Sequence, residues 1–177
     1  MAIQIHDKKF EQYISAETIT AQVKKLAIQI NEDYQGKQPV FIAILNGAFM
    51  FAADLFKEIT IEAEISFIKL VSYKGTTSTG SVITAIGLEE VLKGRHIIVI
   101  EDIVDTGNTL ATFLPQLYNQ LPASLKVAAL LNKPEATEQP VTIDYLGFSV
   151  PDKFLVGYGL DYDGLGRNLP SIYQLTN

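Results

Sequence analysis

A strand of apolar residues that runs directly into two carboxylates and a hydroxyl-rich loop is the segment best suited to chemistry. The run Ile97–Ile100 is followed by Glu101 and Asp102, and an apolar pattern with helical spacing begins at Leu110. This order predicts a buried strand with an acidic end, a tight loop and a helix N-terminus. Unpaired backbone N–H groups and the positive end of the helix dipole make such a helix start an anion site.

The loop between this strand and helix carries the residue types that a phosphate needs. Thr106 and Thr109 offer hydroxyl donors, and Gly107 lets the backbone approach a ligand with no Cβ in the way. The neighbouring acids suit hydroxyl groups, or a divalent cation that bridges to hydroxyl groups. Together these features indicate a sugar phosphate. The competing interpretation is an ordinary strand–loop–helix corner with a few surface acids.

Length, composition and charge exclude several classes of protein. The 177 residues fit a single domain with an ordinary core. A net charge of −6 argues against a general nucleic-acid binder, because such proteins present basic stripes to phosphates. The chain has no cysteine, no apolar stretch of membrane-spanning length and no signal-peptide core near Met1, so we expect a cytoplasmic protein. No P-loop motif is present, and no Gly-x-Gly-x-x-Gly follows a strand.

Helix and strand patterns alternate along the chain, which predicts an α/β fold with a mainly parallel sheet and sites at the carboxyl ends of its strands. The first helix is expected to follow Ser15 and to bury Ile19, Val23, Leu26 and Ile30. Further elements are expected in this order: a strand at 40–45, a helix at 48–57 with Phe49, Ala52, Ala53 and Phe56 on one side, strands at 62–67 and 81–85, and a strand at 127–131. Pro115 predicts a kink or an early break in the helix after the hydroxyl-rich loop. The chain past Asn132 is expected to form a short subdomain.

The segment Glu101–Thr109, with the sequence EDIVDTGNT, resembles the phosphoribosyl pyrophosphate signature of the type I phosphoribosyltransferases. Those enzymes join a nitrogenous base to ribose 5-phosphate with loss of pyrophosphate. The resemblance implies one domain over residues 1–177, built as a mainly parallel twisted sheet flanked by helices. It also implies a small hood from about residues 150–177 and part of the N-terminus. The residues implied to bind the 5-phosphate are Asp105, Thr106, Gly107, Asn108 and Thr109. Glu101 and Asp102 would orient the ribose hydroxyls, directly or through Mg²⁺.

Segments outside the signature, from about Pro39 to Asn168, resemble the hypoxanthine-guanine branch of that family. Residues 45–47, Leu-Asn-Gly, look like the branch's pyrophosphate loop, which implies a cis peptide between Leu45 and Asn46. Many members carry a basic residue in place of Asn46, so here the backbone N–H groups of Asn46 and Gly47 would contact pyrophosphate. Ser72 and Tyr73 open a polar loop that looks like the branch's catalytic lid. A plain turn and a disordered hairpin are the competing interpretations of these two segments.

Two further blocks look like the purine site of that branch. Lys133, in the sequence Leu-Leu-Asn-Lys-Pro, stands where the branch has a lysine that donates to the purine O6. In the second block, the resemblance implies that Phe154 stacks on the purine and that the backbone of Leu155 reads the purine edge. It also implies that Asp161 lies beside the purine and holds Mg²⁺, and that Arg167 binds pyrophosphate. Taken one at a time, Lys133, Phe154 and Asp161 are also compatible with a solvated lysine, a core aromatic and a turn aspartate.

The resemblance therefore predicts an Mg²⁺-dependent enzyme of purine salvage that makes IMP or GMP from phosphoribosyl pyrophosphate and hypoxanthine or guanine. Asp105 would meet N7 of the purine and take or share its proton as N9 attacks the ribose. A carboxylate in a phosphate loop opposes its ligand electrostatically, which is a reason to give Asp105 this second task. The partners expected are the two small-molecule substrates and further copies of the chain, as a dimer or tetramer, with no nucleic acid and no membrane. The alternatives are a phosphoribosyltransferase for xanthine or for guanine alone, and a non-catalytic regulator that senses phosphoribosyl pyrophosphate.

Overall fold

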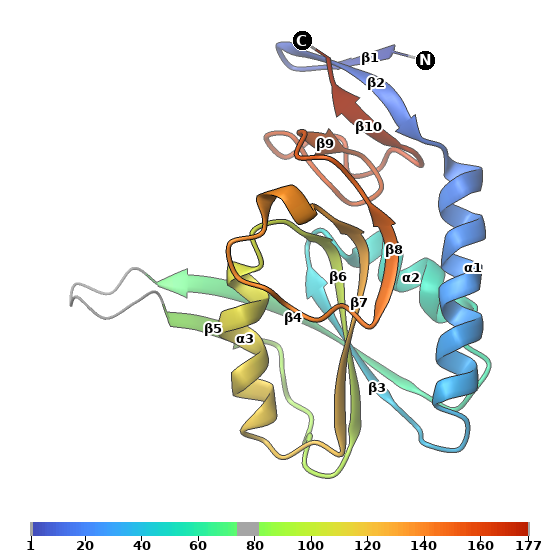
Figure 1. The fold of residues 1–177 in the computed structure, drawn as a ribbon, viewed down its shortest axis with the longest axis vertical. Coiled ribbons are helices and arrows are strands. Elements are labelled where there is room, and N and C mark those ends of the chain that lie inside the picture. The colour runs from blue at the N-terminus through green and yellow to red at the C-terminus, as the bar shows by residue number, and fades with distance from the viewer. Residues whose placement is uncertain (1, 74–81, 177) are drawn as a thin grey trace.

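The computed structural model describes residues 2–73 and 82–176, and a six-stranded sheet forms its centre (Figure 1). The spatial order of the strands is β5-β4-β3-β6-β7-β8. The first in this order, β5, is antiparallel to β4, and the other five strands are parallel. The strands are β3 (Val40–Leu45), β4 (Glu64–Tyr73), β5 (Val82–Ile86), β6 (His96–Val104), β7 (Ser124–Asn132) and β8 (Tyr145–Ser149).

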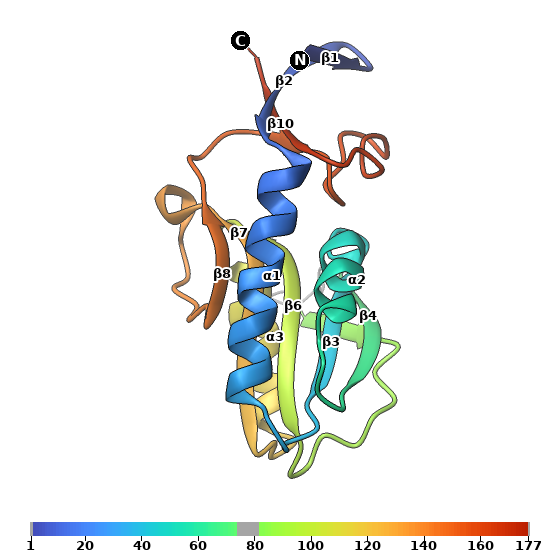
Figure 2. The same cartoon turned by 90° about the vertical axis from the view of Figure 1, so that its right-hand side faces the viewer.

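Helices cover both faces of this sheet (Figure 2). Helices α1 (Ala16–Asp33) and α2 (Phe49–Lys57) pack on one face, and α3 (Asn108–Tyr118) packs on the other. Because side chains alternate along a strand, Phe41 of β3 packs with α1 and α2, whereas Ile42 packs with α3. This burial on both faces explains why the central strands are continuous apolar runs.

A second, antiparallel sheet lies at one end of the molecule, together with both chain termini (Figure 1). Its strands, in the order β1-β2-β10-β9, are β1 (Ala2–Ile5), β2 (Lys8–Ile14), β10 (Ile172–Leu175) and β9 (Leu155–Val156). We call residues 2–14 and 150–176 the hood. The chain passes from the hood into α1 at Ser15. The hydroxyl of Ser15 accepts a hydrogen bond from the backbone N–H of Thr18. No helix in the described ranges is both long enough and apolar enough to cross a membrane.

The strand at 40–45 and the buried stripe of α1 are confirmed, but the predicted buried face of α2 is wrong. Phe49 is 39% exposed and Ala53 is also exposed. The buried residues of this turn and helix are Ala48, Phe51, Ala52 and Leu55. Their spacing of three, four and seven residues from Ala48 is that of a single helix face, so the prediction started from the wrong residue.

Two other expectations are also wrong. Of the kink or early break predicted at Pro115, the break is wrong, because α3 continues to Tyr118. Pro115 is exposed, so the carbonyl that loses its helical donor lies on the side open to water. Residues past Asn132 do not all leave the main sheet, because β8 extends that sheet by pairing in parallel with β7. A short 3₁₀ turn at Pro134–Ala136 begins the connection between β7 and β8.

Candidate active site

The order of the strands places a topological switch point at the carboxyl ends of β3 and β6. These two strands are parallel neighbours, paired from Val40–Ile97 to Ala43–Ile100. The chain leaves β3 through α2 towards β4 and leaves β6 through α3 towards β7, so the two connections diverge. In open α/β sheets, ligands bind at such a switch point, outside the carboxyl ends of the strands.

The loop that follows β3 lies directly against the acidic pair of β6. The Leu45–Asn46 peptide is cis, as the resemblance implied. A Cβ added to Gly47 would lie 1.8 Å from Oδ2 of Asp102, so the backbone at this position leaves room for the carboxylate only because it carries glycine. The other oxygen of Asp102, Oδ1, accepts a hydrogen bond from the N–H of Ile103 at 2.9 Å.

Glu101 and Asp102 lie inside β6, which continues to Val104, and not at its end as predicted. Glu101 is 8% exposed, and its Oε1 accepts a hydrogen bond from the N–H of Asp102 at 3.1 Å. Burial, and then the charge of Asp102, raise the pKa of the Glu101 carboxyl well above its ordinary value. Glu101 is buried and Asp102 is half-buried, so the pair presents an acidic site suited to hydroxyl donors or to a cation.

The loop after β6 forms the N-terminus of α3 and is held by the segment that follows Lys133. Gly107 has a φ of +82°, and a Cβ there would lie 2.0 Å from the carbonyl oxygen of Gln139. The carbonyl of Thr106 accepts hydrogen bonds from the N–H groups of Glu138 and Gln139, each at 2.9 Å. These contacts fix a left-handed turn that aims the first N–H groups of α3 outward.

A small cavity of about 110 Å³ lies at this turn. Its lining residues are Glu101, Ile103, Val104, Asp105, Thr106, Gly107, Thr109 and Leu110. The cap residue Gly107 has no side chain to bond the start of α3, and the hydroxyl of Thr106 accepts a hydrogen bond from the N–H of Asn108 at 3.3 Å. The positive end of the helix dipole at this turn suits an anion. The Asn108 side chain is turned away, since its Nδ2 donates to Oε2 of Glu138 at 2.7 Å. Of the predicted phosphate ligands, Asn108 therefore has its side chain bonded to Glu138 and its backbone N–H bonded to the hydroxyl of Thr106.

Lys133 lies at the edge of this turn between two carboxylates. Its Nζ is 3.3 Å from Oδ2 of Asp105 and 3.4 Å from Oδ1 of Asp152. The residue is 7% exposed, and its backbone N–H donates to the carbonyl of Val104 at 3.0 Å. A buried ammonium group held beside the loop aspartate can donate to a ligand atom next to one that Asp105 contacts.

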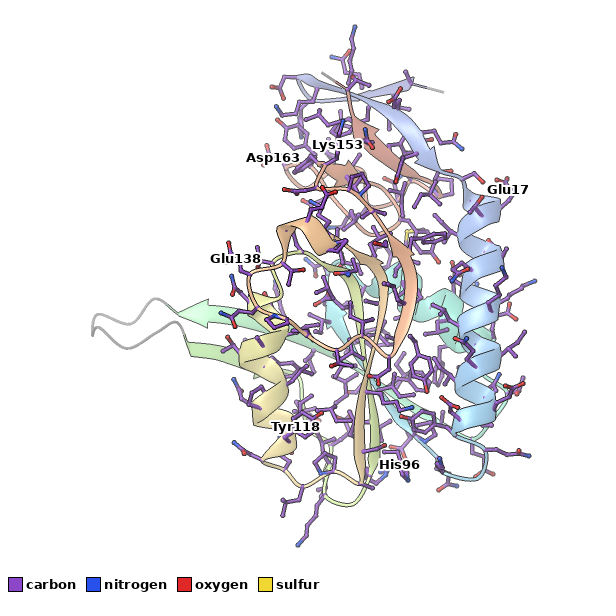
Figure 3. The ribbon with its side chains drawn as sticks, viewed as in Figure 1. Glu17, His96, Tyr118, Glu138, Lys153 and Asp163 are labelled. Atoms are coloured by element: carbon purple, nitrogen blue, oxygen red, sulfur yellow. The ribbon has the colours of Figure 1, made fainter. Side chains whose placement is uncertain are left out.

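The hood supplies an aromatic ring and a cation to the same end of the sheet. Phe154 is 44% exposed, and its ring is held by a perpendicular contact with Tyr162 at a centroid distance of 5.7 Å. Leu155 follows in β9 and is buried. Figure 3 shows the neighbouring Lys153 on the hood and Glu138 on the β7–β8 connection, while His96 lies at the far end of the sheet. An exposed, edge-supported ring can stack on a flat base.

Arg167 forms an ion pair with Asp161 of the hood loop, residues 157–161, which touches the β3 loop. The guanidinium is 2.7 Å from Oδ1 of Asp161, and it also donates to the carbonyl of Gly159 at 2.7 Å. A Cβ on Gly159 would lie 2.0 Å from the carbonyl oxygen of Gly47. The hood loop, the β3 loop and Asp102 are therefore stacked in direct succession.

A comparison with protein families bears on this arrangement. The family model of the phosphoribosyl transferase domain matches residues 10–163, most of the chain. The chain belongs to the phosphoribosyl transferase family. The predicted fold, a mainly parallel sheet flanked by helices, is thereby confirmed.

Individual phosphoribosyl transferases are similar over nearly the whole chain. The hypoxanthine-guanine phosphoribosyltransferase of Streptococcus pneumoniae (strain ATCC BAA-255 / R6) is 41% identical over 160 residues, which are 90% of this chain and 89% of that protein. The hypoxanthine-guanine-xanthine phosphoribosyltransferase of Tritrichomonas foetus is 41% identical over 155 residues, 87% of this chain and 85% of that protein. The crystal structure of a hypoxanthine phosphoribosyltransferase from Staphylococcus aureus matches with a TM-score of 0.88 and 38% sequence identity, over 94% of this chain and 91% of that one.

The oxygen ligands that this phosphoribosyl transferase offers to a metal come in two separate groups. Among residues 2–73 and 82–176, no three His, Cys, Asp or Glu side chains are arranged to hold a metal ion. Both oxygens of Asp161 are engaged, Oδ1 by Arg167 and Oδ2 by the N–H of Gly164 at 2.8 Å. The Glu101–Asp102 pair does fit Mg²⁺, since this ion is commonly held by one or two carboxylates together with the phosphates of a substrate.

Sequence reasoning missed some residues of the site, and one prediction falls outside the described part. Asp152 was not predicted, although an acid two residues before an exposed aromatic ring, in the block that contains Phe154, was an available signal. Asp54 and Tyr158 were missed too, because only the folded chain brings them together. The backbone of Ser72 and Tyr73 ends β4, but their side chains and residues 74–81 lie outside the described residues.

Proposed function

We propose that the chain transfers the 5-phosphoribosyl group from phosphoribosyl pyrophosphate to N9 of hypoxanthine or guanine, releasing pyrophosphate and forming IMP or GMP. One observation carries the proposal: the Lys133 ammonium lies 3.3 Å from the Asp105 carboxylate at the phosphate turn. A 6-oxopurine carries O6 and N7 side by side on one edge. The lysine offers a donor to O6 while the aspartate faces N7.

The same pair of side chains disfavours adenine. Adenine carries an amino group in place of O6, so its N–H donors would face the N–H donors of Lys133. A buried donor left without an acceptor costs about 1–3 kcal/mol, more for a charged group. The proposed base specificity follows from this mismatch, and it is supported by the names of the relatives, which refer to hypoxanthine, guanine and, in one case, xanthine.

The other substrate would lie between the two loops. Its 5-phosphate would bind the turn at Asp105–Thr109 through backbone N–H groups and the threonine hydroxyls. Glu101 and Asp102 would accept hydrogen bonds from the ribose hydroxyls or bind them through Mg²⁺. The backbone of Asn46 and Gly47 would contact pyrophosphate together with Arg167, and Asp161 would hold the guanidinium in place.

In the reaction, the chain's own groups would orient the substrates and manage one proton. Asp105 would take or share the proton at N7 as N9 attacks C1 of the ribose, while Phe154 stacks on the base. Arg167 would stabilise negative charge on the departing pyrophosphate. Mg²⁺, when bound, supplies further neutralisation of that charge. Ser72 and Tyr73 would belong to a lid that excludes water from the cationic ribose.

A regulator that senses phosphoribosyl pyrophosphate without catalysis is the second candidate. Such a protein needs only the phosphate turn. The chain also holds a lysine–aspartate pair for a base and an arginine for pyrophosphate, and these groups favour the enzyme.

A turnover assay with separate bases tests the proposal. Purified protein is given phosphoribosyl pyrophosphate, Mg²⁺ and, in turn, hypoxanthine, guanine, xanthine, adenine or uracil. We expect turnover of hypoxanthine or guanine and none of adenine or uracil. In Asp105→Asn the rate should fall about 10²–10⁴-fold, the range typical for loss of a general acid or base. Lys133→Met removes the donor assigned to O6, and Lys25→Met, which changes an exposed lysine on α1, is its control. Equal use of adenine and hypoxanthine would contradict the assigned role of Lys133.

We also propose that the protein forms a dimer or tetramer. Three large apolar side chains, Phe49, Phe67 and Ile86, are exposed on α2 and on the two strands at one edge of the sheet, by 39%, 42% and 54%. Light scattering tests this, with Phe67→Asp expected to weaken assembly. A monomeric mass for the unaltered protein would contradict the proposal. A cytoplasmic location remains a prediction for cell fractionation.

A further inference from the structure

Tyr158 ties the hood to α2 through one short hydrogen bond. Its hydroxyl donates to Oδ2 of Asp54 at 2.6 Å, across 104 residues of sequence. The tyrosine is 4% exposed, and burial together with this bond raises the pKa of its hydroxyl, so the group remains a donor at neutral pH. Asp54 also pairs with Lys57 at 2.8 Å, but that pair is largely exposed and contributes little.

The backbone around Tyr158 is fixed on both sides. Gly157 and Gly159 have φ values of +102° and +100°, and Tyr158 itself has a φ of +48°. The N–H of Tyr158 donates to the carbonyl of Leu169 at 2.8 Å, and that of Gly159 donates to the carbonyl of Arg167 at 2.9 Å. The loop is therefore a rigid turn, and a displacement of Tyr158 would move Gly159 and Arg167 with it.

This turn meets one structural unit of the core at two points. The side chain of Tyr158 reaches Asp54 on α2, and the backbone of Gly159 lies against the carbonyl of Gly47. Gly47 lies two residues before the start of α2 at Phe49. Both contacts consequently fix the hood loop to the same helix and its leading loop, with Arg167 bonded to Gly159 from the hood side.

We propose that Asp54 and Tyr158 are positioning residues for the pyrophosphate end of the site. Their hydrogen bond holds the hood loop 157–161 over Gly47 and thereby sets the Arg167 guanidinium, paired with Asp161, at the place where a diphosphate binds. Neither residue touches substrate. The inference rests on the proposed function, since it takes the diphosphate of phosphoribosyl pyrophosphate as the ligand of Arg167.

A matched pair of tyrosine variants tests this role. Tyr145 is also 4% exposed and donates to a helix aspartate, Asp33, at 2.5 Å. That bond lies at the far end of α1, about 25 Å from the hood end of the helix. Tyr158→Phe and Tyr145→Phe each remove one buried hydroxyl from the same kind of pair, so they are expected to lower Tm by similar amounts. Only Tyr158→Phe is expected to weaken binding of phosphoribosyl pyrophosphate, by about tenfold.

Affinity is measured by calorimetry with phosphoribosyl pyrophosphate and Mg²⁺ and no base, so the result does not depend on turnover. Asp54→Ala and Asp54→Asn provide a second comparison, because asparagine keeps an oxygen acceptor for the tyrosine hydroxyl and alanine does not. We expect Asp54→Ala to match Tyr158→Phe, and Asp54→Asn to retain most of the affinity. In turnover, KM for phosphoribosyl pyrophosphate should rise more than KM for hypoxanthine.

The outcomes separate this inference from the proposed function. Folded Tyr158→Phe with the affinity of the unaltered protein overturns the inference, as does an equal loss in Tyr145→Phe. If Tyr158→Phe does not fold, an Asp54→Ala variant that binds normally overturns it instead. A protein that turns over no base, yet loses affinity in Tyr158→Phe and not in Tyr145→Phe, supports the positioning role while refuting the proposed function.

Discussion

Replacing Gly47 by alanine tests whether the contact between the β3 loop and the acidic pair matters for function. The added Cβ would lie 1.8 Å from Oδ2 of Asp102 and 2.5 Å from its Cγ. Contacts of Cβ atoms below 3.0 Å essentially never occur, so the oxygen must retreat by more than an ångström. The carboxylate would then lose its hydrogen bond with the N–H of Ile103, or the β3 loop would have to move away from Asp102.

The expected loss follows from the size of this displacement. Misplacing a positioning group by about 1 Å can cost about 10²-fold in rate, equivalent to about 2.7 kcal/mol of transition-state stabilisation. The cost in stability should be about 1–3 kcal/mol for an added methyl group, which the fold can tolerate because Asp102 is a side chain that can turn. Gly47→Ala should therefore fold and lose most of its kcat/KM for phosphoribosyl pyrophosphate.

The assay is steady-state kinetics with varied phosphoribosyl pyrophosphate, alongside thermal unfolding. Gly147→Ala is the matched control, since its Cβ would lie 2.4 Å from the carbonyl oxygen of Leu130, in the sheet and away from the two loops. We expect a loss of stability in both variants, and a large loss of kcat/KM in Gly47→Ala alone. Full activity in folded Gly47→Ala would refute the placement of Asp102 as a ligand of substrate.

Three further substitutions have distinct expected results. Glu101→Gln should lower activity but raise Tm. Because the pKa of Glu101 is raised in the folded protein, the carboxyl lowers stability as the pH rises above its ordinary pKa of about 4.5, so the gain in Tm from Glu101→Gln should be absent at pH 4 and grow towards pH 8. A gain that does not change across this range would contradict the burial argument. Asp152→Asn should raise KM for hypoxanthine about five- to tenfold and leave KM for phosphoribosyl pyrophosphate unchanged, because it removes one of the two charges that hold Lys133. Equal changes in both KM values in steady-state kinetics would count against a role of Asp152 in holding Lys133. Ser15→Ala should cost about 1 kcal/mol, or about 2–4 °C in Tm, with normal kinetics, since it removes the cap of α1; an unchanged Tm would show that the cap contributes nothing.

Local patterns in the sequence predicted the elements whose structure depends on neighbours along the chain. The strand at 40–45 is a run of apolar residues and was predicted with its correct bounds. Ser15 and the stripe that follows it gave the start and the buried face of α1. The buried face of α2 was missed because nearly every residue of that helix is apolar, so the pattern did not single out Phe51 and Leu55 over Phe49.

Contacts between distant segments could not be predicted in this way. β6 continues through Glu101 and Asp102 because β7 pairs with it as far as Val104. The Asp54–Tyr158 and Lys133–Asp152 bonds join segments 104 and 19 residues apart, and no local pattern marks either pair. Tertiary pairing decides such contacts, whereas propensity and periodicity report only what lies within a few residues.

The most direct test of the central proposal is to mix the purified protein with phosphoribosyl pyrophosphate, Mg²⁺ and hypoxanthine and to follow both products by ³¹P nuclear magnetic resonance. We expect IMP and pyrophosphate to appear in equal amounts and phosphoribosyl pyrophosphate to be consumed only when the base is present. Binding of phosphoribosyl pyrophosphate without formation of IMP from hypoxanthine, or of GMP when guanine replaces hypoxanthine, would contradict the proposed function. The protein would then be a sensor of the same fold.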